Sequence, residues 1–195
     1  MANGEVGQIE RKTQARVVKL FRDTLGYTYL GNWEDRPNNS NIEEYLLTNY
    51  LTRKGYSHTH ITKALYELGV AANNYNESLY TNNKNVYKLL RYGVQIKTEA
   101  SENFETVQLI DWKNPEENDF AIAEEVTVLG NHEKRPDIVL YINGIAIGVL
   151  ELKRSTVSIG RSKTQGTLSL SKNSFSTFEQ AKYLSIKKIN SYLSF

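Results

Sequence analysis

The chain has 195 residues, which is enough for one domain with a substantial core and tight for two. Hydrophobic residues make up 39% and charged residues 24%, a composition that is typical of globular proteins and excludes a disordered or fibrous chain. The formal net charge of +2 is nearly neutral, so bulk charge does not indicate a nucleic-acid-binding protein. Any such affinity is expected to come from local patches or from a partner.

Cysteine is absent, which excludes disulfides, thiolate zinc sites and cysteine nucleophiles. Of the three histidines, His58, His60 and His132, the first two have no third metal ligand nearby, and we interpret them as surface residues. No apolar run approaches the roughly 20 residues that cross a bilayer, and residues 1–7 lack the features of a signal peptide. We expect a cytoplasmic protein that does not contact a membrane.

The first half of the chain is expected to be mostly helical. Apolar residues recur at helical spacing in four segments, each followed by a glycine: 8–25, 42–53, 59–68 and 86–92. Residues 31–41 are rich in turn formers and predict an exposed loop. Ser40 or Asn41 is expected to cap the second helix, with Glu43 and Glu44 in its first turn, where carboxylates suit the helix dipole.

After Gly93 the pattern changes from helical to alternating, which predicts strands. Two nearly continuous apolar runs then predict strands that are buried on both faces. They are joined by Asn143-Gly144, a strong signal for a hairpin turn. The five expected strands cover residues 94–98, 106–112, 120–128, 137–142 and 145–150.

Three charged residues gather at one end of the expected hairpin. Asp137 opens its first strand, and Glu151 and Lys153 close its second. A regular two-residue turn would place Asp137 opposite Leu150 and would turn Glu151 away. A three-residue connection, or one inserted residue that forms a β-bulge, would instead make Glu151 the partner of Asp137. A functional site at this end therefore predicts an irregular hairpin.

Two carboxylates and a lysine suit the hydrolysis of a phosphodiester. Carboxylate oxygens bind Mg²⁺ and leave its other positions to water and phosphate. The metal lowers the pKa of a water molecule and offsets charge that develops on the phosphate, while Lys153 can orient the attacking water. The alternative is a buried ion pair between Lys153 and a carboxylate, with no catalytic role.

Two sets of motifs resemble known enzymes. Pro136-Asp137, the hairpin and the triplet Glu151-Leu-Lys153 together resemble the PD-(D/E)xK nuclease superfamily. Over residues 8–160 the chain also resembles the N-terminus of the R (restriction) subunit of type I restriction-modification enzymes. The segments that carry this second resemblance are Glu10-Arg-Lys-Thr-Gln14, Arg16-Val-Val-Lys-Leu-Phe21, Leu25-Gly-Tyr-Thr-Tyr-Leu-Gly-Asn-Trp-Glu-Asp-Arg36, Leu109-Ile-Asp-Trp-Lys-Asn-Pro115, Asn118-Asp-Phe-Ala-Ile-Ala-Glu-Glu-Val126 and Glu151-Leu-Lys-Arg-Ser-Thr156.

The resemblance implies a fold and roles for particular residues. The fold would be α/β and restriction-endonuclease-like, a mixed β-sheet flanked by helices. Asp137 and Glu151 match the metal-binding acids and Lys153 the catalytic lysine, with Mg²⁺ as the cofactor and Mn²⁺ as a substitute. Glu10 matches an acid that the family often carries beside the site, although a carboxylate in a first helical turn explains it equally well.

The implied substrate is double-stranded DNA, and the implied partners are the methyltransferase and specificity subunits of the restriction complex. In this family an ATP-driven motor in the same polypeptide pulls the DNA through the complex before cleavage. The chain has no Walker A loop, Gly-x-x-x-x-Gly-Lys-Ser/Thr, so it is not expected to bind ATP.

The end of the chain departs from the family pattern. The family usually carries Gln-x-x-x-Tyr on a helix after the lysine strand. Here Gln165 is followed by Ser169 at the tyrosine position, and Gln180 reaches Tyr183 one residue too early. A truncated or frame-shifted gene would explain why the resemblance ends near Gly160.

We therefore expect a nuclease domain over residues 1–160, helical over 1–92 with a sheet core over 93–155, and an atypical Ser/Lys-rich tail over 161–195. The leading hypothesis is a Mg²⁺-dependent endonuclease domain of an R subunit. The alternative is a catalytically inactive module that docks on the restriction complex or on DNA. A junction resolvase or repair nuclease of the same fold is disfavoured by the N-terminal resemblance.

Overall fold

The structure, a computed structural model, describes residues 3–97, 103–127 and 134–152, with the side chains of the first helix described from Arg11 onward. The helices are α1 (Asn3–Lys19), α2 (Glu44–Arg53), α3 (His58–Ala72) and α4 (Leu79–Tyr92), with a π-helical turn at Leu20–Thr24 and a 3₁₀ turn at Pro115–Glu117. The strands are β1 (Thr28–Asn32), β2 (Val94–Ile96), β3 (Glu105–Val107), β4 (Phe120–Glu124), β5 (Ile138–Ile142) and β6 (Ile145–Leu150). None of the helices so described is long and apolar enough to cross a bilayer.

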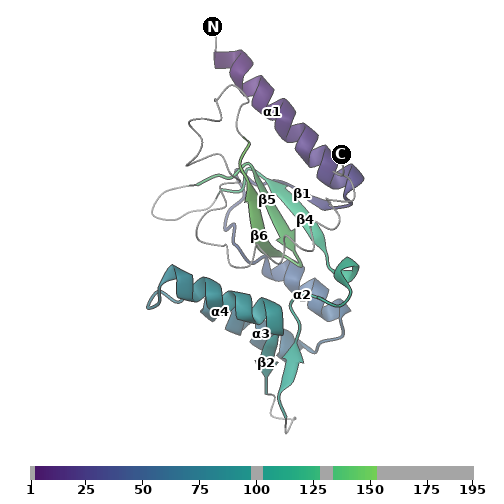
Figure 1. Cartoon of the computed structure of the whole chain (residues 1–195), viewed down its shortest axis with the longest axis vertical. Helices are drawn as coiled ribbons and strands as arrows, with labels where there is room; N and C mark the ends of the chain where they lie inside the picture. The colour runs from purple at the N-terminus through teal and green to yellow at the C-terminus, as the bar shows by residue number, and fades with distance from the viewer. Residues whose placement is uncertain (1–2, 98–102, 128–133, 153–195) are drawn as a thin grey trace.

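Four strands form a mixed sheet in the order β1-β4-β5-β6, and β2 and β3 form a separate antiparallel pair. Strand β1 is parallel to β4, whereas β4, β5 and β6 are antiparallel neighbours. Figure 1 shows α1 beside the upper end of the sheet and α2, α3 and α4 below it. The expected fold class, a mixed sheet flanked by helices, is confirmed.

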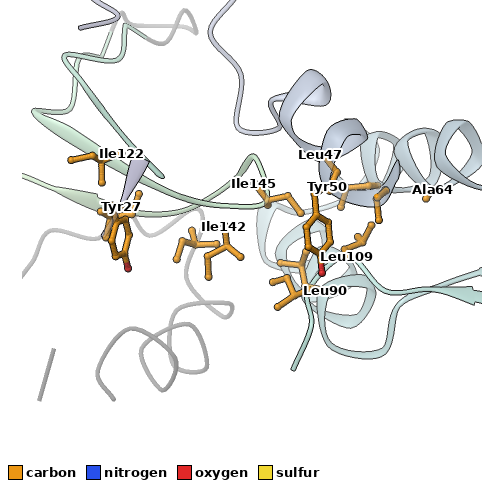
Figure 2. Packing of buried hydrophobic residues seen from close by; sticks show 14 of the residues in the cluster. Tyr27, Leu47, Tyr50, Ala64, Leu90, Leu109, Ile122, Ile142 and Ile145 are labelled. Carbon is orange, nitrogen blue, oxygen red and sulfur yellow. The ribbon is translucent and has the colours of Figure 1, made fainter. Parts of the chain in front are cut away.

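The larger hydrophobic cluster covers one face of the sheet and continues into the helices below. Figure 2 shows Ile142 and Ile145 of the β5–β6 hairpin between Tyr27 on one side and Leu47 and Tyr50 of α2 on the other. Leu47 is 0% exposed, and burying a side chain of this size stabilises the fold by about 1.5–3 kcal/mol. The sheet and the lower helices therefore share one core.

The opposite face of the sheet is covered by a smaller cluster around Trp33, which packs on Val139 and Tyr141. The guanidinium carbon of Arg36 lies 3.8 Å from the Trp33 ring centroid, and Arg36 Nη2 donates to Glu43 Oε2 at 2.7 Å. Strand β5 is thus buried on both faces, as its continuous apolar run predicted. Strand β6, at the edge of the sheet, is only partly buried, since Ala146, Val149 and Leu150 are half-buried.

The hairpin turn at Asn143-Gly144 is confirmed, with φ of 51° and 82° at the two residues, the positive values that a two-residue hairpin turn favours. The turn is buried rather than exposed. The Asn143 side chain donates to Leu109 O at 2.9 Å and to Asn118 Oδ1 at 2.8 Å, and it accepts from the backbone N–H of Asp119 at 2.7 Å. Gly144 O accepts from the backbone N–H of Glu43 at 2.8 Å, next to the start of α2.

Two helices run longer than the sequence predicted, α3 at its end and α4 at its start, whereas α4 ends before Gly93 as expected. Helix α3 continues through Gly69 to Ala72, because the Asn73 side chain donates to Gly69 O at 3.1 Å and ends the helix one turn later. Helix α4 starts seven residues before the expected 86, because Ser78 Oγ accepts from the backbone N–H of Thr81 at 3.1 Å and caps it.

The expected cap of the second helix was wrong. Glu43, not Ser40 or Asn41, occupies the N-cap position of α2, and its side chain makes no capping hydrogen bond. The Glu43 carboxylate instead accepts hydrogen bonds from Arg36. Ser40 Oγ accepts from the backbone N–H of Ile42 at 3.1 Å, in the turn before the helix.

In three segments the strand boundaries differ from those that the sequence predicted. Residues 31–32, expected to begin a loop, belong to β1. The strand expected at 106–112 ends at Val107, because Asp111 Oδ1 accepts from the backbone N–H groups of Lys113 and Asn114 at 3.1 and 2.9 Å and forms a turn. The strand expected at 120–128 ends at Glu124, since Glu125 takes a left-handed φ of 50°.

Candidate active site

The β5–β6 hairpin contains the irregularity that a site at its open end requires. Near the turn, Tyr141 pairs with Ala146, but further along Leu140 pairs with Gly148, so Ile147 has no partner on β5. Beyond this bulge the register makes Ile138 the partner of Leu150. Continued by one residue, it sets Asp137 against Glu151.

Core packing supports the shifted register. Ile145 and Ile147 belong to the larger cluster, whereas Val149 packs in the smaller cluster with Val139 and Tyr141. In a strand without a bulge, Ile145, Ile147 and Val149 would all lie on one face. Because Val149 has changed face, Glu151 follows it to the side of Val139 and Asp137.

Asp137 and Glu151 lie at the same open end. Asp137 is the residue before β5 and Glu151 is the residue after β6, and Asp137 Oδ2 accepts from the backbone N–H of Leu152 at 2.5 Å. The two residues line one cleft of about 670 Å³, together with Gln14 of α1 and Glu124 at the end of β4. Asn32, the last residue of β1, also lines the cleft, which therefore joins α1 to the ends of all four strands of this sheet.

Negative charge predominates in this cleft. Its lining contains five carboxylates and two arginines: Glu34, Glu124, Glu125, Asp137 and Glu151 against Arg11 and Arg135. Arg135 is already paired, because its Nε lies 3.0 Å from Glu125 Oε2 and its Nη1 donates to Glu34. A dianionic phosphate or a phosphodiester would be repelled from the cleft unless a cation were present.

Gln14 ties α1 to the strand ends. Its Nε2 lies 3.0 Å from both Glu124 Oε2 and Glu125 Oε1, and 3.4 Å from the backbone oxygen of Asp137. The backbone N–H of Glu125 donates to the same Asp137 oxygen at 3.0 Å. The main chain at Asp137 is thus held from two directions.

Tyr29 of β1 adds a neutral donor beside Glu124. Burial, and then the hydrogen bond to Glu124, raise the pKa of the Tyr29 phenol above its ordinary value. The phenol consequently stays protonated at neutral pH and keeps its proton for that carboxylate.

The structure describes the side chains of two of the four predicted site residues, Asp137 and Glu151. Both line the same cleft. Lys153 lies outside the described residues. Glu10 falls within α1, but its side chain is outside the described part. His132 also lies outside it, while His58 is exposed at the start of α3.

The described residues contain no group of three His, Cys, Asp or Glu side chains placed to bind a metal. A pair of carboxylates is nevertheless enough for Mg²⁺, which keeps several water ligands and is commonly held by one or two protein carboxylates. Asp137 and Glu151, one on each strand end of the same cleft, fit that requirement.

Sequence reasoning assigned no role to Gln14, Glu124, Glu125 or Arg135, which the structure places in the cleft. Two signals were present. Gln14 is four residues after Glu10, so both lie on one side of a helix. Glu124 and Glu125 are consecutive carboxylates directly after a buried strand, where an unpaired charge is costly.

The described residues form an α/β domain in which helices flank a mixed sheet, with an acidic pair at the open end of its hairpin. Residues 8–180 match the model of the family described as type I restriction enzyme R protein N terminus. The chain belongs to this family. The match continues past Gly160, where the resemblance was expected to end.

Relatives of the chain include three proteins of Methanocaldococcus jannaschii that are named type I restriction enzyme endonuclease subunits. MjaVIIP is 40% identical over 65 residues, 33% of this chain and 6% of the relative. MjaVIIIP is 50% identical over 48 residues, 25% and 5% respectively, and MjaIXP is 36% identical over 73 residues, 34% and 7%. The matched region is therefore a small part of much longer proteins.

Proposed function

We propose that this chain is the nuclease domain of a type I restriction enzyme R subunit and that it hydrolyses phosphodiester bonds of double-stranded DNA in a Mg²⁺-dependent reaction. The observation that carries the proposal is the bulge at Ile147, which sets Glu151 against Asp137. Bulges are frequent next to active sites, where they redirect a side chain. Membership of the family and the names of the relatives support a restriction nuclease.

Asp137 and Glu151 would hold Mg²⁺, or Mn²⁺ in its place. The bound ion would lower the pKa of a water molecule and offset charge on the phosphate. Asp137 is well prepared for this role, because the backbone N–H of Leu152 fixes Oδ2 and leaves the other oxygen for a ligand. Lys153 would orient the attacking water and stabilise the charge of the transition state, and Glu10 would stand beside the site from α1.

The remaining acids of the cleft are engaged in structural contacts. Glu124 accepts from Gln14, and Glu125 accepts from Gln14 and pairs with Arg135. Their charge is thereby partly offset, and their positions help to hold the strand ends. We assign the metal to the pair at the hairpin end, Asp137 and Glu151.

The partners we propose are the methyltransferase and specificity subunits of a cytoplasmic restriction complex, with DNA delivered by an ATP-driven motor. The relatives are named as endonuclease subunits of type I enzymes, which supports a role inside such a complex. The 195 residues by themselves are expected to nick DNA slowly.

The test measures nicking of supercoiled plasmid by the full chain in Mg²⁺ or Mn²⁺. Asp137→Asn and Glu151→Gln remove one negative charge each with little change of shape. We expect each to lower the nicking rate at least about 100-fold, the scale of losing a group that stabilises a transition state. Glu77→Gln is the matched control, because Glu77 is exposed in the loop between α3 and α4.

Equal rates for the unchanged chain and Asp137→Asn, together with no binding of Mn²⁺ by calorimetry, would overturn the proposal. That result would favour a catalytically inactive module that docks on the restriction complex or on DNA.

A further inference from the structure

Helix α1 carries a row of exposed cations on its outer face. Lys12, Arg16 and Lys19 are exposed and follow one another at intervals of four and three residues, so they share one side of the helix. The residues from Arg11 to Arg22 include no acid. The opposite side of the same helix enters the core through Val18.

Most other arginines of the described residues are paired with acids, and these three cations are not. No ion pair within 4.0 Å joins Lys12, Arg16 or Lys19 to a carboxylate among the described side chains; the cation–acid pairs found there include Arg22–Asp23, Arg36–Glu43, Arg53–Asp119, Lys54–Asp111 and Arg135–Glu34. Lys19 interacts electrostatically with Asp23, an acid that also pairs with Arg22, so its charge is partly offset. The outer face of α1 keeps a net positive charge.

This charge lies beside the acidic cleft. Arg11 and Ala15, on the flank of α1 next to the cation row, line the cleft together with Asp137 and Glu151. Figure 1 shows α1 along the upper end of the sheet, where β6 ends. A polyanion attracted to α1 would be brought next to carboxylates that repel it by themselves.

We propose that Lys12, Arg16 and Lys19 form a phosphate-binding track that holds the backbone of duplex DNA against the cleft. The inference rests on the proposed function and names the surface through which its substrate is held. From Lys12 to Lys19 the helix rises about 10 Å, which equals about three base-pair steps of duplex DNA along its axis. The track supplies attraction without base recognition, which suits a nuclease domain that reads no sequence.

Helix α4 provides a matched control within the same chain. Lys84, Lys88 and Arg91 are exposed, have the same spacing of four and three residues, and contain the same two lysines and one arginine. Helix α4 lies below the sheet (Figure 1), and none of its residues lines the cleft. Replacing either set with glutamine lowers the net charge by the same amount, so an effect of bulk charge would appear in both variants.

The experiment titrates the full chain against a labelled duplex of about 30 base pairs by fluorescence anisotropy, over a series of salt concentrations and with Ca²⁺ in place of Mg²⁺. We expect Lys12→Gln/Arg16→Gln/Lys19→Gln to bind at least about tenfold more weakly at about 0.1 M salt, and to lower the salt slope by up to about three. Lys84→Gln/Lys88→Gln/Arg91→Gln should stay within about twofold of the unchanged chain.

Thermal melting establishes that both variants are folded, and a Lys12→Arg/Lys19→Arg variant should keep the affinity because it keeps the charge. If the α1 and α4 variants lost DNA affinity equally, or if the α1 variant lost none, the track would be overturned. The nuclease proposal would then still stand, provided that the unchanged chain nicks plasmid. An unchanged chain that neither binds nor nicks DNA would overturn both.

Discussion

The two ends of the β5–β6 hairpin differ in whether hydrogen bonds satisfy their polar side chains. At the turn, Asn143 is 0% exposed, and its side-chain amide makes hydrogen bonds to Leu109, Asn118 and Asp119. At the open end, Asp137 and Glu151 bring two carboxylates together in a cleft that already holds three more. One end satisfies its polar groups, and the other concentrates like charge.

The contrast separates stability from chemistry along one hairpin. A satisfied buried amide stabilises the fold, whereas neighbouring carboxylates repel one another and lower its stability. Such an arrangement is typical of functional sites, where activity is kept at some cost in stability. The turn end is accordingly expected to tolerate substitution poorly and the open end to tolerate it well.

The largest effect is expected for Gly144→Ala at the turn. A Cβ at Gly144 would lie 2.7 Å from Glu43 O and from Leu46 Cβ, and the left-handed φ adds strain of about 1–2 kcal/mol. We expect a loss of at least about 3 kcal/mol in the free energy of unfolding, since overpacking alone costs about 1–3 kcal/mol. Urea denaturation measures it.

Gly26→Ala is the control for backbone strain. Gly26 has a similar φ of 73°, but nothing lies within 4 Å of the added Cβ. The free energy of unfolding of Gly26→Ala should fall by about 1–2 kcal/mol, the cost of a left-handed residue. Equal losses at the two glycines would show that the contact with α2 does not constrain the turn.

The next effect is expected for Asn143→Ala, which leaves Leu109 O and the backbone N–H of Asp119 without their buried partner. An unsatisfied buried group costs about 1–3 kcal/mol, so we expect a loss of about 2–4 kcal/mol in urea denaturation. Asn38→Ala is the control, because Asn38 is exposed and has a similar φ of 59°. A loss at Asn143 no larger than at Asn38 would contradict the role of the buried amide.

At the open end, Asp137→Asn should change the free energy of unfolding by less than about 1 kcal/mol without metal, because the amide keeps an oxygen for the Leu152 N–H. Mg²⁺ at ten times its Kd should stabilise the unchanged chain by about 1.4 kcal/mol and leave this variant unaffected. Thermal melting with and without Mg²⁺ measures both effects. Asn143→Ala should still be stabilised by Mg²⁺. A variant that Mg²⁺ did not stabilise would contradict the separation of stability and chemistry between the two ends of the hairpin.

The smallest effect is expected for Gln14→Ala, which removes the bonds to Glu124 and to the Asp137 backbone. The Mg²⁺ concentration for half-maximal nicking should rise about threefold to tenfold, less than the usual effect of removing a partner of a metal ligand, because Gln14 holds the main chain of Asp137. Gln95→Ala, in the β2–β3 pair, removes only a bond to Thr106 and should leave this concentration unchanged. A fall in nicking with no change in the Mg²⁺ requirement would assign Gln14 to general stability.

The sequence predicted the hairpin well because its signals are local. The apolar runs and Asn143-Gly144 predicted the strands and the turn. The requirement that Asp137 meet Glu151 predicted either a three-residue connection or a bulge, and the structure has the bulge. Its position at Ile147 was not predictable, since Ile147 is an ordinary buried residue in an apolar run. Bulges depend on how both faces pack, which a single strand does not encode.

Other features depend on contacts between distant segments. The Asn143 side chain reaches Leu109 and Asn118 across at least 25 residues of sequence, and Gln14 reaches Glu124 across 110. Local propensity contains no information about such pairs. Likewise, the side chain of Arg36 pairs with the carboxylate of Glu43, the N-cap residue of α2, and this contact lies outside the helix. Helix propensity alone does not predict it.

The bulge also links the spacing of the two acids to the shape of the hairpin. Asp137 and Glu151 are 14 residues apart, and with a two-residue turn an even separation makes them partners only if one residue bulges. Loss of the single codon for Ile147 would give an odd separation and a regular hairpin in which the two acids are still opposite each other. In comparisons between genomes, an even separation between the aspartate and the glutamate therefore indicates a bulge, and an odd separation a regular hairpin.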